Sequence, residues 1–442
     1  MSDLVDSSWP RTTIKESSYL KGRIGWQGLK ASEFIDHGPY LITGTDFHDG
    51  SIDWSSCYHV TEERYKEGAY IHVRNGDLLI TKDGTIGKIA HVTSCPPKAV
   101  LNSGIFLLRC SNGSYEHRFL YHLLKSDVFD AFLRLNLAGS TINHLYQNVF
   151  ERFVFPVPDS KLQRCFVRIL DSIDGQIEQT DALIAKYQQI KAGLMHDLFT
   201  RGVTPDGHLR PTRAQAPHLY RESPLGWIPK EWEVRRLGVI LKECGGYFQT
   251  GPFGSQLHAY EYQHEGVPVV MPQDINDGIV STEQIARISE RRAEDLMRHR
   301  MKTGDIVIAR RGDLSRASVI TDREETWLCG TGCFLLRLGR STLHGDFAAL
   351  VYRHDVVQRQ IAGMAVGTTM PSLNNNVMER LLFPYCDPNE QSRITERIGS
   401  LDQSLRLAQR HLANSTQVKH GLMQDLLTGR VRVKVSEAEE KR

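Results

Sequence analysis

Several sequence features that would place this chain in a familiar class of protein are missing. The amino-terminal stretch MSDLVDSSWPRTTIKESSYL has no apolar core, so we expect no secretion signal. No run of about 18 or more apolar residues occurs, so we expect no membrane span. The eight cysteines form no Cys-x-x-Cys pair. Cys329 and Cys333 fall in what we interpret as one strand, about 13 Å apart, which is too far for a disulfide. These absences predict a cytoplasmic protein with reduced thiols and no membrane partner.

The motifs of DNA-modifying chemistry are also missing. The only Pro-Pro pair, Pro96-Pro97, lies between a cysteine and a lysine and cannot form the Asn-Pro-Pro-Tyr type of loop that holds an adenine. Gly87-Lys88 is not part of a phosphate-binding G-x-x-x-x-G-K-[ST] loop, because Lys82 occupies the first glycine position and Ile89 follows the lysine. No zinc-ligand spacing is found. We therefore expect no catalytic residue, no metal site and no bound cofactor.

What the chain does contain is an internal repeat. KAGLMHDLFTRGV at 191–203 resembles KHGLMQDLLTGRV at 419–431, a shift of 228 residues. The same shift aligns GDLLITKDGTIGKIAHVT at 76–93 with GDIVIARRGDLSRASVIT at 304–321. It also aligns GSTINHLYQNVFERFVFP with GTTMPSLNNNVMERLLFP, which begins at Gly367. A shift held without gaps indicates a duplicated unit.

Each repeat has the same two parts. Short runs such as DLLIT, GIFLLRC and DIVIA are typical of strands, and helical segments lie between them, which predicts an α+β globule. A long helix follows each globule, and its apolar residues have the heptad spacing of a coiled coil. The predicted seam residues are Phe166, Leu170, Ile173, Ile177, Ile184, Ile394, Ile398, Leu401, Leu405 and Leu412. We expect the two long helices to pair as an antiparallel coiled coil with an internal pseudo-two-fold axis.

The predicted domains and helices follow one another along the chain. We predict a recognition domain at 1–159, a long helix at 160–200, an extended Pro-rich linker at 201–230, a second recognition domain at 231–388, a second long helix at 389–428 and a charged tail at 429–442. The start of the first domain is the least defined boundary, because that half has no clear counterpart of PLGWIPKEWEVRRLG at 224–238.

The two globules share a scaffold and differ in their loops, for example TKDGTIGK against ARRGDLSR. Variable loops on a constant scaffold favour recognition. Two spaced heads suit a linear partner such as double-stranded DNA, whose major groove recurs about every 34 Å. The net charge of +2 is too small to argue for nucleic acid by itself, so local patches must supply the contacts.

These motifs together resemble the specificity subunits of type I restriction-modification enzymes. The resemblance covers nearly the whole chain and rests on the repeated K-x-G-L-M-x-D-L-[LF]-T helix end, the GD-[LI]-[LV]-I strand and the Phe-Pro step before each long helix. It implies a non-catalytic subunit that reads an asymmetric, bipartite DNA site with one domain per half-site. It also implies partners: two adenine-methylating modification subunits and two restriction subunits, which would bind S-adenosylmethionine, ATP and Mg²⁺ in place of this chain.

The candidate DNA-binding residues fall into three groups, of which one is the loop at 82–88 of the first domain, equivalent to 310–316. Residues 291–316 carry eight Lys or Arg and four Asp or Glu, a balance of +4, and an ordinary charged face is the alternative. The segments before Phe155 and Phe383 are rich in Asn and Gln, which match the adenine edge, and a turn or capping role is the alternative. The candidates are Lys82, Thr85, Lys88, Asn143, Tyr146, Gln147, Arg298, Arg300, Lys302, Arg310, Arg311, Arg316, Asn374 and Asn375.

The repeated helix ends are the candidate partner-docking residues: Gly193, Leu194, Met195, Gly421, Leu422 and Met423. Packing against the chain's own domains is the alternative for them. Two other functions stay open, a two-headed protein scaffold without a DNA role and a self-contained restriction-modification enzyme. The missing catalytic motifs argue against the enzyme.

Overall fold

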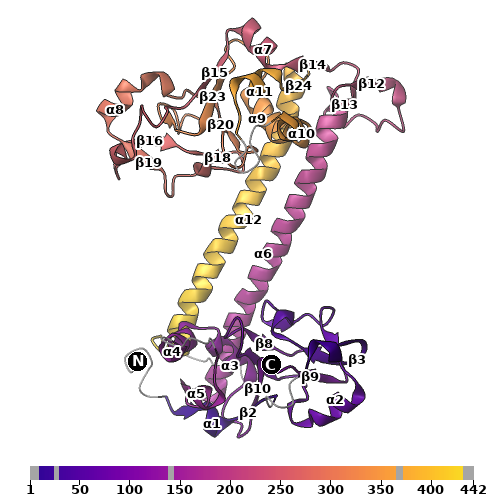
Figure 1. The fold of residues 1–442 in the computed structure, drawn as a ribbon, viewed down its shortest axis with the longest axis vertical. Coiled ribbons are helices and arrows are strands. Elements are labelled where there is room, and N and C mark those ends of the chain that lie inside the picture. Colours follow the sequence, from indigo (N-terminus) through magenta and orange to yellow (C-terminus); the bar gives the residue numbers. More distant parts are fainter. Residues whose placement is uncertain (1–8, 24–28, 138–143, 365–371, 432–442) are drawn as a thin grey trace. The chain divides into compact units, whose positions relative to one another are not determined.

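A computed structural model of the 442-residue chain describes residues 9–23, 29–137, 144–364 and 372–431. The chain divides into two compact units (Figure 1). The first unit contains Met1–Leu183 and Ala408–Arg442, and the second contains Ile184–Leu407. Both units combine sheets with helices, which confirms the predicted α+β class. Each also contains a part of both long helices, α6 (Ser160–Arg201) and α12 (Pro388–Thr428).

The other elements of the first unit, among them short 3-10 helices labelled η, come before α6 in the sequence. They are β1 (Arg11–Thr13), α1 (Ile14–Ser17), β2 (Ser18–Gly22), η3 (Ala31–Glu33), β3 (Ile35–Ile42), η4 (Gly44–Asp46), β4 (Phe47–His48), β5 (Ser51–Ile52), β6 (Tyr58–His59), α2 (Glu62–Glu67), η5 (Ala69–Ile71), β7 (Leu78–Thr81), β8 (Ile89–His91), β9 (Ala99–Leu101), β10 (Ile105–Cys110), α3 (His117–Leu124), α4 (Asp127–Leu137), α5 (Gln147–Phe150) and β11 (Val154–Pro156).

The second unit lies between the two long helices in the sequence. Its elements are η6 (Pro217–Leu219), β12 (Tyr220–Ser223), β13 (Gly226–Pro229), β14 (Glu233–Arg236), α7 (Leu237–Cys244), β15 (Tyr247–Thr250), η7 (Ala259–Glu261), β16 (Val267–Val270), η8 (Pro272–Asp274), β17 (Ile275–Asn276), β18 (Ile279–Val280), β19 (Ala286–Ile288), α8 (Glu290–Asp295), η9 (Met297–His299), β20 (Ile306–Ala309), β21 (Ala317–Val319), β22 (Leu328–Cys329), β23 (Cys333–Arg337), α9 (Gly345–Arg353), α10 (Asp355–Met364), α11 (Asn375–Arg380) and β24 (Leu382–Tyr385).

Each unit is built on a four-stranded sheet and a three-stranded sheet. In the first unit the strand orders are β2-β10-β7-β8 and β6-β3-β9. Strand β7 is buried on both faces, with Leu78 and Ile80 in one apolar core and Leu79 in another. Because both faces of this strand are covered, successive residues must be apolar, which explains the LLIT sequence. The second unit has the same orders, β15-β23-β20-β21 and β19-β16-β22.

The repeat found in the sequence is a repeat of structure. From β2 and β15 onwards, each element of the first unit recurs in the second at or close to the 228-residue shift, as β7 (Leu78–Thr81) does in β20 (Ile306–Ala309). The shift also relates α3 to α9 and α6 to α12. Duplication therefore preserved the strand order and the helices between the strands.

The GD motif at the start of β7 has a structural role. Gly76 has a φ of 88°, which favours glycine, and it is followed by Asp77, whose side chain is 3% exposed. Asp77 forms an ion pair of 2.5 Å with Arg109 on the neighbouring strand β10. Asp305 and Arg337 repeat this contact at 2.5 Å in the second unit. The motif therefore clamps two central strands in both units.

In the first unit the end of α12 packs against the start of α6. Phe166 and Leu170 of α6 share a core with Met423 and Leu427 of α12. One turn further along α6, Asp174 forms an ion pair of 2.5 Å with Lys419. Rising residue numbers on one helix meet falling numbers on the other, so the segments are antiparallel.

The second unit repeats this arrangement with the helices exchanged. Leu198 and Phe199 of α6 share a core with Ile394 and Ile398 of α12. Lys191 of α6 forms an ion pair of 2.5 Å with Asp402 of α12, the equivalent of the Lys419–Asp174 pair at a shift of 228. The predicted antiparallel pairing is thus confirmed within each unit. Of the predicted seam residues, Phe166, Leu170, Ile394, Ile398 and Leu405 are buried and Ile173, Ile177, Ile184, Leu401 and Leu412 are half-buried.

The predicted extended linker at 201–230 is wrong. This segment is ordered against the second unit and contains η6 and a hairpin of β12 and β13. Val203 is fully buried, and its main-chain N–H donates to Glu390 at 2.7 Å. Arg210 forms a buried ion pair of 2.5 Å with the same carboxylate. The segment contains five prolines and is still folded, because burial of Val203 and the ion pair of Arg210 hold it against the second unit.

The missing counterpart at the amino-terminal edge is also found. Strand β1 pairs with β11 so that Thr12 lies opposite Phe155, and β14 pairs with β24 so that Arg235 lies opposite Phe383. The shift between Thr12 and Arg235 is 223 rather than 228, because α7 has eight residues and α1 has four and the turn after α7 is longer. At this shift Trp9 corresponds to Trp232. A five-residue difference in length had hidden the equivalence.

Candidate nucleic-acid interface

Two segments that the sequence suggested separately lie together in each unit. The loop after β7 contacts the segment before α5 through a β-bridge between Asp83 and His144. Leu145 N–H donates to the carbonyl of Lys82 at 2.9 Å. In the second unit Arg311 and Ser372 form the same bridge. These contacts join residues 61 apart in the sequence, so no local pattern could have predicted them.

The first residue of each loop is a cation over a phenylalanine ring. The Lys82 ammonium lies 5.0 Å from the centre of the Phe106 ring. Arg310, its equivalent, lies 5.9 Å from Phe334 and 5.7 Å from Phe253. Both cations are half-buried, and burial is the main cause that lowers the pKa of Lys82. The scaffold thus holds one cation at the same place in both units.

Main-chain hydrogen bonds hold the backbone of these two residues in place. Lys82 N–H donates to Gly104 at 2.8 Å, and Arg310 N–H donates to Gly332 at 2.7 Å. The Nε atom of Arg310 is buried and has no hydrogen-bond partner among the residues that the structure describes. A buried guanidinium donor without an acceptor is costly, by about 1–3 kcal/mol.

The next residue of each loop differs in charge between the units. Asp83 forms an ion pair with His144 in the first unit. Arg311, at the equivalent position, is exposed, and its side chain makes no ion pair with the described part of the chain. The same backbone therefore presents an acid in one unit and a base in the other.

The other candidates on the first loop are exposed. Thr85 and Lys88 both have exposed side chains. Their main-chain atoms bond to the buried Thr81 hydroxyl, which donates to the Thr85 carbonyl at 2.6 Å and accepts from the Lys88 N–H at 2.9 Å. The loop is therefore held by its backbone and leaves both side chains free to contact a partner.

The Asn- and Gln-rich segments divide into exposed and structural residues. Tyr146 is 54% exposed beside His144. Gln147 bonds to Glu151 at 2.8 Å. Asn374 caps α11 by accepting from the Val377 N–H at 3.0 Å, the capping role that was its alternative. Asn375 is exposed at the start of that helix, and Asn143 lies outside the described residues.

The basic patch predicted at 291–316 is not one surface. Lys302 precedes β20 and Arg310 follows it, so about eight residues of extended chain, roughly 26 Å, separate them. Arg298 is exposed on η9, and Arg300 forms an ion pair of 2.6 Å with Glu290. These residues lie at the end of β20 opposite to Arg310. The patch was predicted as one because the sequence places the charges close together.

Arg316 has an internal role that the sequence did not indicate. Its Nη1 lies 3.0 Å from the Asn276 Oδ1 and within 3.4 Å of three carbonyls of residues 272–275. Its Nε forms an ion pair of 3.2 Å with Asp313. The guanidinium therefore ties two loops of the second unit together. Of the candidate basic residues of this segment, those with exposed side chains are Arg298, Lys302 and Arg311.

One group of possible metal ligands occurs in the described residues. His122, Asp171 and Asp174 bring their ligand atoms within 4.8 Å of one another. Asp171 already contacts His122 at 2.7 Å and Arg118 at 2.8 Å, and Asp174 contacts Lys419. Arg118 and Lys419 neutralise the two carboxylates, so the group fits an internal network better than a metal.

The thiols do not have the environment of nucleophiles. Burial raises the pKa of Cys329 to about 12 and raises that of Cys333 as well. The two residues lie on different strands, β22 and β23, and not on one strand as predicted, because Gly330 to Gly332 turn the chain between them. None of the described helices is long and apolar enough to cross a lipid bilayer.

The predicted docking residues are partly used by the chain itself. Met423 is buried in the core of the first unit, and Leu422 packs against that core. Leu194 and Met195 pack against the core of the second unit. A Cβ at position 193 or 421 would have no described atom within 4 Å apart from its chain neighbours and the backbone of its own helix.

Comparison with known proteins gives one consistent result. The family described as "Type I restriction modification DNA specificity domain" matches residues 25–189. The type I restriction enzyme MjaVIII specificity subunit of Methanocaldococcus jannaschii is 24% identical over 98% of this chain and 99% of its own length.

Solved structures agree in fold. The S subunit of the type I restriction-modification system of M. genitalium superposes with a TM-score of 0.60 at 17% identity, covering 98% of each chain. A structure described for "complex assembly" and "conformational transition of the type I R-M system" superposes with a TM-score of 0.53 at 16% identity, covering 97% of this chain and 99% of that one. Sequence and fold thus confirm the predicted resemblance: this chain is similar to the specificity subunits of type I restriction-modification enzymes.

Proposed function

We propose that this chain is the DNA sequence-specificity subunit of a type I restriction-modification complex, and that each unit reads one half of a bipartite site. One observation carries the proposal. In both units equivalent main-chain hydrogen bonds hold a cation and the residue that follows it, while the side chains at these two positions differ between the units. Constant geometry with changed chemistry is what two related readers of unequal half-sites need.

The chemistry of these positions suits base edges. An arginine can donate two parallel hydrogen bonds to guanine, and such a contact discriminates by about 1–3 kcal/mol. Arg310 is half-buried at this position, and Arg311 is exposed beside it. Lys82 offers a single charged point, and Asp83 can accept from the amino group of cytosine. The two units would therefore prefer different bases.

Partner docking forms the second part of the proposal. The glycines at 193 and 421 leave open space on α6 and α12, where the backbone of another subunit could approach. We place two adenine-methylating subunits there and two restriction subunits in the full complex. S-adenosylmethionine, ATP and Mg²⁺ would be bound by those subunits.

A map of methylated adenines tests the proposal. The source genome is mapped with the gene for this chain intact and with it deleted. We expect one methylated motif, two short unequal blocks separated by a fixed gap, to disappear in the deletion. An unchanged map, obtained while the modification subunit is demonstrably expressed, contradicts the proposed function.

The scaffold alternative is tested with the reconstituted complex. If the units bind DNA, the logarithm of the association constant falls with the logarithm of salt concentration with a slope of several units, because phosphate contacts release counterions. A complex that assembles normally and shows no salt-dependent DNA binding favours the scaffold.

A further inference from the structure

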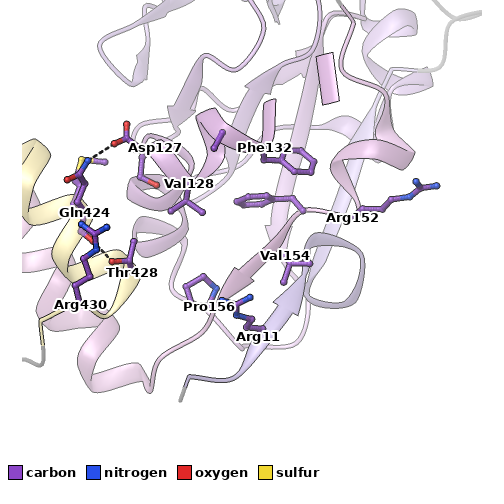
Figure 2. A pocket seen from close by; sticks show the side chains of 14 residues that line it. Arg11, Asp127, Val128, Phe132, Arg152, Val154, Pro156, Gln424, Thr428 and Arg430 are labelled. Carbon is purple, nitrogen blue, oxygen red and sulfur yellow. Dashed lines mark hydrogen bonds between the residues drawn. The ribbon is translucent and has the colours of Figure 1, made fainter. Parts of the chain in front are cut away.

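The first unit contains an apolar pocket that the proposed function does not use. The cavity has a volume of about 460 Å³ and lies between α4, β11 and the last turn of α12 (Figure 2). Val128, Ala131 and Phe132 of α4 line it, and Val154 of β11 lies opposite. All of these residues belong to one unit, so the pocket is a feature of that unit alone.

Strand β11 presents an open edge to this pocket. Its sheet has only two described strands, β1 and β11. Val157 N–H donates to the Pro10 carbonyl at 2.8 Å, and Ile14 N–H donates to the Phe153 carbonyl at 3.2 Å. Bonded and non-bonded pairs alternate in an antiparallel ladder. Val154 therefore belongs to a non-bonded pair, and its N–H and C=O point away from β1.

The second unit shows how such an edge is satisfied. Leu382 is the equivalent of Val154, and Gln360 is the equivalent of Phe132. The Gln360 Nε2 donates to the Leu382 carbonyl at 3.0 Å, and the Leu382 N–H donates to the Gln360 Oε1 at 2.9 Å. One amide group thus fills both positions. Phe132 has no polar atom, so the same two groups of Val154 have no such partner in the first unit.

Larger side chains accompany this amide in the second unit. Ser126 and Ala131, which line the pocket, are replaced by His354 and Arg359 at the equivalent positions. The pocket of the first unit is therefore a local difference between two copies of one fold. Its shape leaves room beside the outward N–H and C=O of Val154, which make no main-chain hydrogen bond to β1.

The rim of the pocket is positively charged. Arg11, Arg152 and Arg430 line it with exposed side chains, and none of the three forms an ion pair within the described residues. The carboxylate of Asp127, also at the rim, already accepts from Gln424 at 2.8 Å. An occupant that brings negative charge is favoured.

We propose that this pocket binds a short, extended, acidic peptide segment of a partner protein. One amide unit of the peptide pairs with the N–H and C=O of Val154, as the Gln360 amide does with Leu382. One apolar side chain enters the pocket beside Phe132, and carboxylates lie against Arg11 and Arg152. Pro156 has no N–H, so pairing is limited to the stretch around Val154.

Fluorescence polarisation with the full chain tests the site. The probe is a labelled peptide of sequence Asp-Glu-Leu-Asp-Glu with blocked ends, and Lys-Lys-Leu-Lys-Lys serves as its charge-reversed counterpart. We expect saturable binding of the acidic probe only. Arg152→Glu weakens it at least tenfold, whereas Arg291→Glu, an exposed arginine of the second unit, leaves it unchanged.

Two variants address the strand edge and the cavity. Val154→Pro removes the outward N–H without touching the β1 pairing and weakens binding about tenfold, whereas Val154→Thr keeps the N–H and binds like the native chain. Ala131→Arg introduces the residue of the second unit, Arg359, and closes the pocket. Equal binding by all variants, or loss with Arg152→Glu alone, overturns the proposal.

The chain's own carboxyl-terminal segment is the competing occupant. A chain ending at residue 431 is compared with the full chain in the same assay. Equal affinity supports a site for a partner protein. An affinity at least tenfold higher in the shorter chain shows that residues 432–442 compete for the pocket and overturns the assignment to a partner.

Discussion

Single residues at equivalent positions distinguish the two units. Arg310 and Lys82 have equivalent backbone hydrogen bonds and an equivalent phenylalanine neighbour. The two units therefore differ at this position in the side chain and not in the backbone. Arg310→Ala removes the guanidinium and its parallel N–H donors. The discrimination between bases at one position of one half-site should then fall by about 1–3 kcal/mol. Sequencing of methylated motifs measures this, with Arg340→Ala, which changes an exposed arginine, as the control. Relaxation in both half-sites, or in neither, would contradict a reading role.

Buried histidines make the fold sensitive to acid. Burial lowers the pKa of His91 from 6.5 to about 4. Because the folded pKa is depressed, the stabilisation is present above the unfolded value of about 6.5 and is lost as the pH falls from there towards 4. The pseudo-symmetric residue is Val319, so His91→Val should reduce the loss of stability between pH 7.5 and pH 5.5 by up to about 1 kcal/mol.

Thermal melting at the two pH values measures this difference. His411→Gln, a substitution of an exposed histidine on α12, serves as the control and should melt like the native chain. If His91→Val keeps the full acid sensitivity, the other histidines with a pKa lowered by burial, such as His299 and His354, account for it.

At the scale of elements, the segment at 201–230 of the second unit is held by one carboxylate. Glu390 accepts from Val203 and pairs with Arg210, and the two charged side chains are 5% and 9% exposed. Glu390→Gln should cost about 2–4 kcal/mol, because the buried guanidinium loses its counter-charge. Limited proteolysis should then cut within residues 202–230. Glu231→Gln is the matched control, because that carboxylate is 62% exposed and 3.7 Å from Arg210; equal cleavage of both variants argues against the anchor.

At the scale of the whole molecule, the first unit is completed by the far end of the sequence. Met423, Leu426 and Leu427 belong to the core built by residues before 171. Deletion of residues 408–442 should therefore unfold the first unit while the second, which is contiguous in sequence, keeps its core. Hydrogen exchange should show lost protection in β7 and β10 and kept protection in β20 and β23.

A point substitution checks the same idea with the chain intact. Leu427 is fully buried, and Leu427→Ala should destabilise the first unit by about 2–5 kcal/mol through the cavity that it creates. Uniform loss of protection in both units would show that they unfold together and would contradict the division.

Local pattern and duplication were enough to predict much of this protein. The strands are apolar runs because they are covered on both faces, and the 228-residue shift carried each element from one half to the other. The Lys191–Asp402 and Lys419–Asp174 pairs, which were not predicted from the sequence, are related by the same shift. The predicted features depend on neighbours in sequence or on equal spacing, which a sequence displays directly.

Only the tertiary structure decided which distant residues meet. It joined Asp83 to His144, separated Lys302 from Arg310 by the length of a strand, and used Arg316 and Asn374 inside the fold. It also ordered the Pro-rich segment and left Val154 with an open edge. Each of these outcomes depends on contacts across many residues of chain, where burial and hydrogen-bond geometry select the partner and sequence spacing carries no information.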